Sequence, residues 1–235
     1  MFIACVETRL REVTLGYSRL YAYPTTPIID NSKIIILDSG AFGLSQQGRK
    51  MTRKYIHGLA KFYQQYSDYD NIYCIAPDEF KNPNVTIAQY QYYIENYDNK
   101  VAPVIQFRTS TFDLYSAKKQ IDFYFTVNPN LKMICISNNK FNPVKSLKEI
   151  KFIVDYIKRK NSETWIHVLG AGYNHQNVID WHKTGVNSID SISYYTDAKH
   201  GLQWQYGSDK LASSGKKFIE LSLDNLKIAN KKREY

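Results

Sequence analysis

The feature that most constrains the fold is the recurrence of short apolar runs at intervals of roughly 30 residues, with helix-like stretches between them. The runs are continuously apolar and do not alternate with polar residues, which is typical of parallel strands covered on their outer face. The eight predicted strands span residues 2–6, 34–37, 72–76, 101–106, 133–137, 165–169, 188–192 and 218–221.

Helical periodicity separates these runs. Thr52 and Ser146 are predicted N-caps, and Glu149 follows Ser146 at the spacing of a capping box. The predicted helices span residues 52–66, 85–97, 110–123, 146–159, 174–184 and 224–232.

Eight strand and helix units predict a single α/β domain over residues 1–235, folded as a compact (β/α)8 TIM-type barrel. A doubly wound open sheet is the alternative, which is disfavoured because no GxGxxG motif follows the first strand. The last strand is the least supported. The glycine-containing, polar stretch over residues 193–215 predicts a long loop.

The charge balance favours a polyanionic partner. The chain has 31 Lys and Arg residues against 22 Asp and Glu residues, a net charge of +9. Each phosphate that such a surface neutralises releases counterions and adds affinity that does not depend on sequence. The longest apolar run, residues 34–37, is too short to span a bilayer, and the N-terminal residues lack the features of a signal peptide. We therefore expect a cytoplasmic protein with no membrane partner.

Cysteine and histidine spacing predicts no metal site. Cys5, Cys74 and Cys135 lie far apart in apolar segments and are expected to be buried, reduced thiols, and no CxxC pair occurs. The histidines show no ligand spacing and are expected to be structural or surface residues, with His200 the one most suited to touch a substrate. They are His57, His167, His175, His182 and His200.

The chemistry is predicted at the ends of the strands. Asp38, Asp78 and Asp190 each follow or end an apolar run, Gln106 ends another, and a Gly170-Ala171-Gly172 turn follows the sixth. The carboxyl ends of all strands in a parallel barrel open onto one face, where these residues would converge on one pocket. Taken singly, each aspartate could be a turn or cap residue and the glycines a simple helix-entry turn. Three acids at corresponding strand ends favour a functional site.

The ordered set of strand ends resembles the tRNA-guanine transglycosylase family. Its aspartate–serine–glycine–glycine–aromatic motif is similar to Asp38-Ser39-Gly40-Ala41-Phe42, and its second acidic strand end is similar to Ala76-Pro77-Asp78-Glu79. The family's Val-Gln segment resembles Pro103-Val104-Ile105-Gln106, and its Leu-Gly-Gly turn resembles Val168-Leu169-Gly170-Ala171-Gly172. The strand end with its nucleophilic aspartate resembles Ser188-Ile189-Asp190-Ser191.

The resemblance implies a double displacement at C1′ of a nucleotide, with no cofactor. Asp190 would be the nucleophile that forms a covalent aspartyl-sugar intermediate while the bases exchange. Asp38 would act as the acid and base that moves the proton on the departing guanine and then on the incoming base.

The resemblance also implies a site for the base. Asp78 would accept from N1–H and the exocyclic amine of guanine, while Gln106 and the Gly170 N–H would donate to the base carbonyl. Ser39 belongs to the same base-binding motif. Phe42 would stack on the ring, and the alternative is an ordinary core aromatic.

The implied partner is a nucleic acid together with a free 7-deazaguanine. The tRNA-acting members carry a cysteine and histidine zinc module after the barrel, and this chain supplies no such thiolates. It fits better with the shortened relatives, many of them phage-encoded, that insert 7-deazaguanines into DNA, and the host cytoplasm would then be its location. The target base would be flipped out or single-stranded. Lys199, His200 and Trp204, in a predicted loop over residues 194–207, would contact the strand.

Two other functions use the same residues. A nucleoside or nucleotide N-glycosidase would transfer the sugar to water instead of to a second base. A non-catalytic nucleic-acid-binding subunit would pair with an active partner, although such a subunit has no need of a nucleophile. The sequence leaves open an accessory protein or a homodimer.

Overall fold

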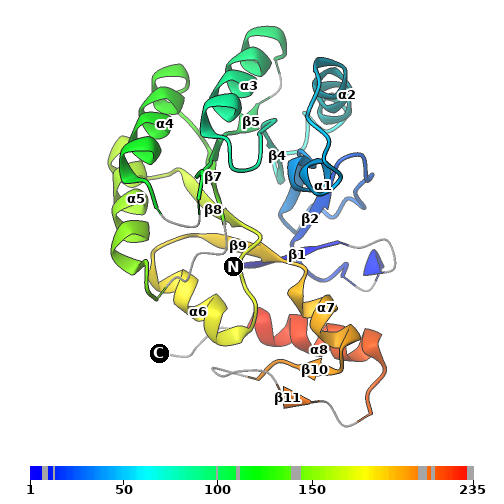
Figure 1. The fold of residues 1–235 in the computed structure, drawn as a ribbon. Coiled ribbons are helices and arrows are strands. Elements are labelled where there is room, and N and C mark those ends of the chain that lie inside the picture. The colour runs from blue at the N-terminus through cyan, green and yellow to red at the C-terminus, as the bar shows by residue number, and fades with distance from the viewer. Residues whose placement is uncertain are drawn as a thin grey trace.

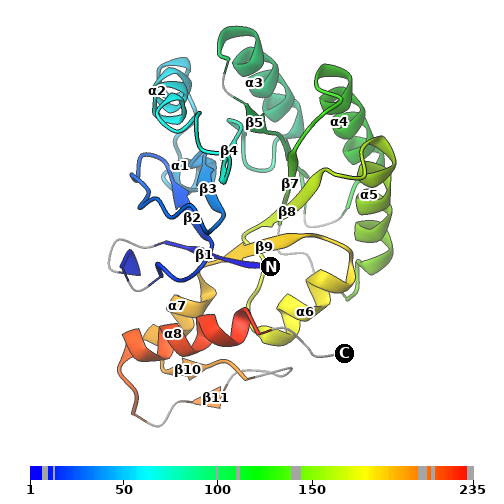
Figure 2. The same ribbon diagram turned by 180° about the vertical axis from the view of Figure 1, so that it is seen from behind.

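A parallel sheet of nine strands curls into a nearly closed barrel in the computed structural model, with helices on its outside (Figures 1 and 2). The structure describes residues 1–6, 10–12, 14–98, 100–109, 112–138, 144–205, 211–212 and 215–231. The strand order is β5-β4-β3-β2-β1-β9-β8-β7-β6, and neighbouring strands of this sheet pair in parallel. This arrangement confirms the predicted (β/α)8 TIM-type architecture.

The two strands at the ends of this order are consecutive in the chain. Only Pro103 separates β5 (Val101–Ala102) from β6 (Val104–Ile105). β5 pairs with β4 and β6 pairs with β7. Residues 101–105 therefore act as one strand, through which an eight-strand barrel closes.

The other seven strands of the barrel lie between β5 and β6 in the strand order. They are β1 (Phe2–Cys5), β2 (Arg19–Ala22), β3 (Ile35–Asp38), β4 (Ile72–Ile75), β7 (Met133–Ser137), β8 (Trp165–Leu169) and β9 (Ser188–Ser191). A separate antiparallel pair is formed by β10 (Leu202–Gln203) and β11 (Leu211–Ala212).

The helices follow β3 and the later strands of the barrel. They are α1 (Ala41–Gln46), α2 (Arg53–Gln64), α3 (Pro83–Asn96), α4 (Leu114–Val127), α5 (Leu147–Lys160), α6 (His175–Lys183), α7 (Ser193–Lys199) and α8 (Phe218–Ala229). Among the residues described between β1 and β3 there is no α-helix. In the part of the chain that the structure covers, no helix combines the length and apolarity needed to cross a membrane.

Seven of the eight predicted strands are confirmed, and the eighth is wrong. Residues 218–221 begin α8, where Leu221, Asn225 and Ala229 are buried at a helical spacing of four. The missing strand is β2, which escaped prediction because it has only four residues and begins with the charged Arg19. Arg19 is nevertheless buried, with its guanidinium 5.8 Å from the centre of the Tyr21 ring.

The predicted helices are found with their ends shifted by up to six residues, and two short helices, α1 and α7, were not predicted. Thr52 caps α2, because its side chain accepts from the Tyr55 N–H at 3.2 Å. Ser146 occupies the N-cap of α5, but its side chain makes no cap hydrogen bond, so the predicted capping box is wrong. The predicted loop over residues 193–215 contains α7, β10 and β11.

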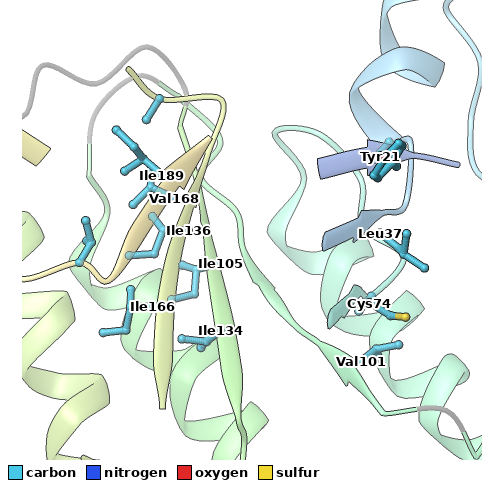
Figure 3. Packing of buried hydrophobic residues seen from close by; sticks show 14 of the residues in the cluster. Tyr21, Leu37, Cys74, Val101, Ile105, Ile134, Ile136, Ile166, Val168 and Ile189 are labelled. Atoms are coloured by element: carbon cyan, nitrogen blue, oxygen red, sulfur yellow. The ribbon is translucent and has the colours of Figure 1, made fainter. Parts of the chain in front are cut away.

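The apolar core has two layers, because successive side chains of a strand point to opposite faces. Ile3, Ile36 and Cys135 belong to the smaller cluster inside the barrel. The larger cluster, part of which Figure 3 shows, lies between strands and helices and includes Val168 and Ile189. Residues that neighbour members of this larger cluster along a strand therefore point into the barrel. This alternation decides which polar side chains lie together in the barrel interior.

The turn after β8 depends on a close approach of the backbone to the core. Gly172 has a φ of 99°, and a Cβ placed there would lie 3.1 Å from both Ile189 Cδ1 and Phe2 Cε2. Gly170 has a φ of 63°, but a Cβ there would meet no atom within 4 Å. The glycine turn predicted from the sequence is thus required most strictly at its second glycine.

We expect Gly172→Ala to destabilise the protein by about 1–3 kcal/mol, because it combines a disfavoured φ with contacts in the core. The matched control, Gly170→Ala, carries only the left-handed strain of about 1 kcal/mol. Denaturant unfolding of both variants measures the difference. Equal losses in the two variants would contradict a packing requirement at Gly172.

Candidate functional site

The polar residues predicted at the strand ends lie together at the carboxyl end of the barrel. Asp38 ends β3, Asp78 follows β4, Gln106 directly follows β6, Gly170 directly follows β8, and Asp190 lies in β9. Because all the strands are parallel, these positions share one face of the barrel. Hydrogen bonds organise this face into two groups, one around Asp78 and one around Asp190.

Asp78 is held by two side chains. Its Oδ1 accepts from Ser39 Oγ at 2.7 Å, and its Oδ2 accepts from Gln106 Nε2 at 2.8 Å. Asp78 is only 4% exposed. Gln120 of α4 holds Gln106 in turn through two bonds of 2.9 Å, one to its backbone N–H and one to its backbone carbonyl. The carboxylate therefore has a fixed position and orientation.

A strained backbone residue fixes the direction of the Gln106 amide. Lys81 has a φ of 60°, in the left-handed region, and its N–H donates to Gln106 Oε1 at 3.2 Å. With its carbonyl oxygen occupied, the amide turns its Nε2 towards Asp78. In this structure Gln106 therefore donates to a carboxylate, whereas the sequence predicted a base carbonyl as its acceptor.

Asp190 is held by three donors, of which two come from β8 and its carboxyl end and one comes from β1. Its Oδ1 accepts from the Gly170 N–H at 3.1 Å and faces His167 Nε2 at 3.0 Å, while its Oδ2 accepts from Cys5 Sγ at 2.9 Å. Asp190 is 3% exposed. A carboxylate so deeply buried needs such donors to offset the loss of water. The Gly170 N–H, predicted to face a base, serves this carboxylate.

The sequence did not predict Cys5 and His167 as partners of Asp190. It predicted only a buried thiol at Cys5 and only a structural or surface residue at His167. A histidine between Ile166 and Val168 in a continuously apolar strand was the available signal, since those neighbours face the outer layer. Burial, then the charge of Asp190, raises the pKa of the Cys5 thiol well above its usual value, so the thiol stays protonated and donates.

Burial also makes two of the carboxyl groups weaker acids. The pKa of Asp38 is raised to about 7, chiefly by burial and then by the charges of Asp78 and Asp190, although the Gly40 N–H opposes the shift. The pKa of Asp78 is raised to about 6 by burial, against the hydrogen bonds from Ser39 and Gln106. A carboxyl group with a pKa near 7 can both give and take a proton at neutral pH.

An aromatic pair, exposed Phe42 and half-buried Phe80, follows the strand ends that carry Asp38 and Asp78. Phe42 of α1 is 58% exposed and meets Phe80 edge to face, with ring centres 5.4 Å apart. Lys81 Nζ lies 5.3 Å from the centre of the Phe80 ring. Phe42 is therefore no core residue, and the alternative interpretation of it is wrong. Phe80 was not predicted, although it directly follows Asp78-Glu79.

Residues 194–207 were predicted to form a loop that contacts the nucleic-acid strand, and the prediction of a loop is wrong for most of them. Residues 194–199 belong to helix α7 and residues 202–203 to β10. Trp204 is a core residue, 1% exposed, whose Nε1 donates to Asp197 Oδ2 at 2.7 Å. Residues 206 and 207 lie outside the described residues. Lys199 and His200 are exposed at the far end of α7, the end away from β9, and Lys199 Nζ lies 5.4 Å from the centre of the Tyr195 ring.

Cys74 and Cys135 are buried, as predicted, and Cys5 is half-buried. Within the described parts of the chain, no group of three His, Cys, Asp or Glu side chains is arranged to hold a metal ion.

Comparison with known proteins assigns the chain to no family. No protein-family model matches the chain, and no curated protein sequence matches it. The chemistry of the site therefore rests on the arrangement of its own residues.

The raised pKa values predict how stability depends on pH. Between about pH 4 and pH 7 the folded protein binds protons at Asp38 and Asp78 that the unfolded chain has released, so stability falls as the pH rises through this window. We expect Asp38→Asn to be more stable than the wild type at pH 8, by about 1 kcal/mol or more, and to match it near pH 4.

Denaturant unfolding at both pH values measures this difference. Asp70→Asn is the control, because Asp70 is exposed and precedes β4, at the opposite end of the strand from Asp78. If Asp38→Asn and the wild type had equal free energies of unfolding at both pH values, ionisation of Asp38 would not destabilise the fold.

Proposed function

We propose that the protein is a guanine transglycosylase that exchanges guanine in a nucleic acid, DNA in preference to tRNA, for a 7-deazaguanine. One observation carries this proposal. A carboxylate fixed by three donors, Asp190, shares one end of the barrel with a carboxyl group whose pKa is raised to about 7, Asp38. A fixed nucleophile beside an acid and base group is what a double displacement at C1′ requires.

In the first step Asp190 attacks C1′ of the target nucleotide. The new bond joins a carboxylate oxygen to C1′, the C1′–N9 bond breaks, and its electron pair leaves with the guanine, which takes a proton from Asp38. Oδ2 is the better nucleophile, because it accepts only from the thiol of Cys5, a weak donor, whereas Oδ1 has two N–H partners.

In the second step the incoming deazaguanine loses its N9 proton to the Asp38 carboxylate. Its N9 then attacks C1′, the ester bond to Asp190 breaks, and the carboxylate is restored. Asp38 suits both steps because a pKa near 7 lets it donate first and accept afterwards.

The base would be recognised by Asp78 and stacked against Phe42. Each oxygen of Asp78 accepts one internal hydrogen bond, and a carboxylate has about four acceptor positions, so it can also take N1–H and the exocyclic amine. Ser39 and Gln106 hold Asp78 for this contact. In the structure Gln106 Nε2 donates to Asp78 and the Gly170 N–H donates to Asp190. In this proposal, each would donate to the base carbonyl as well as to its carboxylate.

The rim of the same face supports a polyanionic partner. Arg49, Lys50, Lys81 and Arg108 are all exposed in segments that follow β3, β4 and β6. Phosphates bind such side chains with release of counterions, and the exposed Phe42 ring offers a surface on which a flipped base can stack.

We expect Asp190→Asn to lose at least about 10³-fold in exchange activity, because the amide keeps the shape of the side chain but not its nucleophilicity. The assay incubates the protein with guanine-labelled DNA, and separately with tRNA, plus 7-cyano-7-deazaguanine, followed by nucleoside mass spectrometry. Asp70→Asn serves as the control.

Incorporation by the wild type into DNA alone supports the proposal in full, and incorporation into tRNA alone corrects the substrate. Release of label with no incorporation indicates an N-glycosidase. Full exchange by Asp190→Asn would remove this residue from the role of nucleophile.

Binding to a single-stranded DNA oligonucleotide is expected to weaken steeply with salt. The double variant Arg49→Ala/Lys50→Ala should reduce the slope of log K against log[salt] by about 1.4, roughly 0.7 for each phosphate of a single strand that is no longer neutralised. Lys61→Ala/Arg159→Ala removes the same charge from the last turns of α2 and α5 and serves as the control. Fluorescence anisotropy measures both slopes, and equal slopes would exclude the rim as the binding surface.

A further inference from the structure

A chain of three hydrogen bonds runs through the barrel interior to Asp190. Trp165 Nε1 donates to Ser188 Oγ at 2.7 Å, Ser188 Oγ lies 2.8 Å from His167 Nδ1, and His167 Nε2 lies 3.0 Å from Asp190 Oδ1. Ser188 and His167 have no solvent exposure. The chain therefore lies in a part of the core where each polar atom needs a partner.

The register of two neighbouring strands produces this chain. Trp165 and His167 are two residues apart on β8, Ser188 and Asp190 are two apart on β9, and His167 pairs with Ser188 across the sheet. Side chains two apart share a face of a strand. All four point into the barrel, since the residues between them, Ile166 and Ile189, belong to the outer layer.

The direction of each bond follows from its donor and acceptor types. An indole N–H can only donate, so Ser188 Oγ accepts from Trp165. An ionised carboxylate can only accept, so His167 carries a proton on Nε2. A neutral ring then has a lone pair on Nδ1, and the Ser188 hydroxyl, with one lone pair taken by Trp165, donates its proton there.

The opposite arrangement would leave a polar group unsatisfied. If His167 also carried a proton on Nδ1, it would donate to Ser188, whose own O–H would then lack an acceptor among the described residues. A buried donor without a partner costs free energy. The chain therefore favours the neutral Nε2–H form of His167.

We propose that Ser188 and Trp165 are positioning residues that keep Nδ1 of His167 unprotonated, so that the neutral ring orients Asp190 through its Nε2–H without pairing it with a full cation. The catalytic consequence rests on the proposed function, because a neutral donor fixes a carboxylate but withdraws less of its charge than an imidazolium does. The tautomer itself does not depend on any activity.

The first experiment is ¹⁵N NMR of the histidine rings in the full chain near pH 7.5, with the His167 signals identified by their loss in His167→Asn. In the wild type we expect a protonated Nε2 and an unprotonated Nδ1. In Ser188→Ala the Nδ1 signal should shift towards its protonated position, and Ser188→Thr, which keeps the hydroxyl, should restore the wild-type pattern.

Two further variants test the chain independently of Ser188. Trp165→Phe removes the N–H and keeps an aromatic ring, so it should loosen the orientation of the hydroxyl and change the Nδ1 signal even if Ser188→Ala does not fold. Ser222→Ala removes a buried hydroxyl of α8 whose partner is the Phe218 carbonyl, and it should leave His167 unchanged.

Exchange kinetics separate this inference from the proposed function. Ser188→Ala is expected to lower kcat by about tenfold with KM unchanged, the effect of removing one neutral hydrogen bond. A wild type that shows the expected tautomer but no exchange would overturn the transglycosylase and leave the positioning chain intact. A His167 ring that is protonated on Nδ1 in the wild type, or is unchanged in both Ser188→Ala and Trp165→Phe, would overturn the positioning chain.

Discussion

The removal of water from three carboxyl groups is the physical constraint on which the rest of the site depends. Burial disfavours the charged form of each group, and the number of hydrogen-bond donors that offset this cost differs from one group to the next. Asp190 receives three donors, Asp78 receives two side-chain donors, and Asp38 receives the Gly40 N–H at 3.1 Å. Three residues of one type thus acquire different chemical properties from the number and strength of their partners.

The supporting residues come from much of the barrel. Cys5 lies on β1, Ser39 follows β3, Gln106 follows β6 and is held by α4, and His167 lies on β8. Each partner is placed by a strand or helix that also packs in the apolar core. The site is therefore rigid because of the same packing that stabilises the fold, and its geometry is coupled to the closure of the barrel.

Much of the fold was visible in the sequence, since continuous apolar runs separated by helical periodicity identify parallel strands. β2 was not, because its four residues begin with a charged arginine and leave only a very short apolar run. The first turn of α8 was mistaken for a strand because four residues are too few to distinguish a period of two from one of 3.6. The acidic strand ends were recognisable because strand direction alone brings them to one face.

The partners of those acids were harder to predict. Cys5 and Asp190 are separated by most of the chain, and only the parallel pairing of the first barrel strand, β1, with the last, β9, brings them together. The assignment of guanine exchange, drawn from the resemblance of five short motifs, remains a prediction. The exposure of Phe42 and the burial of Trp204 also depend on tertiary packing, which local sequence does not encode.

The way in which the barrel closes also bears on its motion. Pro103 has no N–H, so the strand formed by residues 101–105 lacks one donor where it joins β4 to β7. Local opening of a sheet costs least where backbone hydrogen bonds are fewest. Breathing of the barrel should therefore begin at this strand, where backbone amides would exchange their protons with solvent sooner than those of β7 or β8. Because Gln106 is the next residue, such openings would give solvent brief access to Asp78 from the side of the barrel.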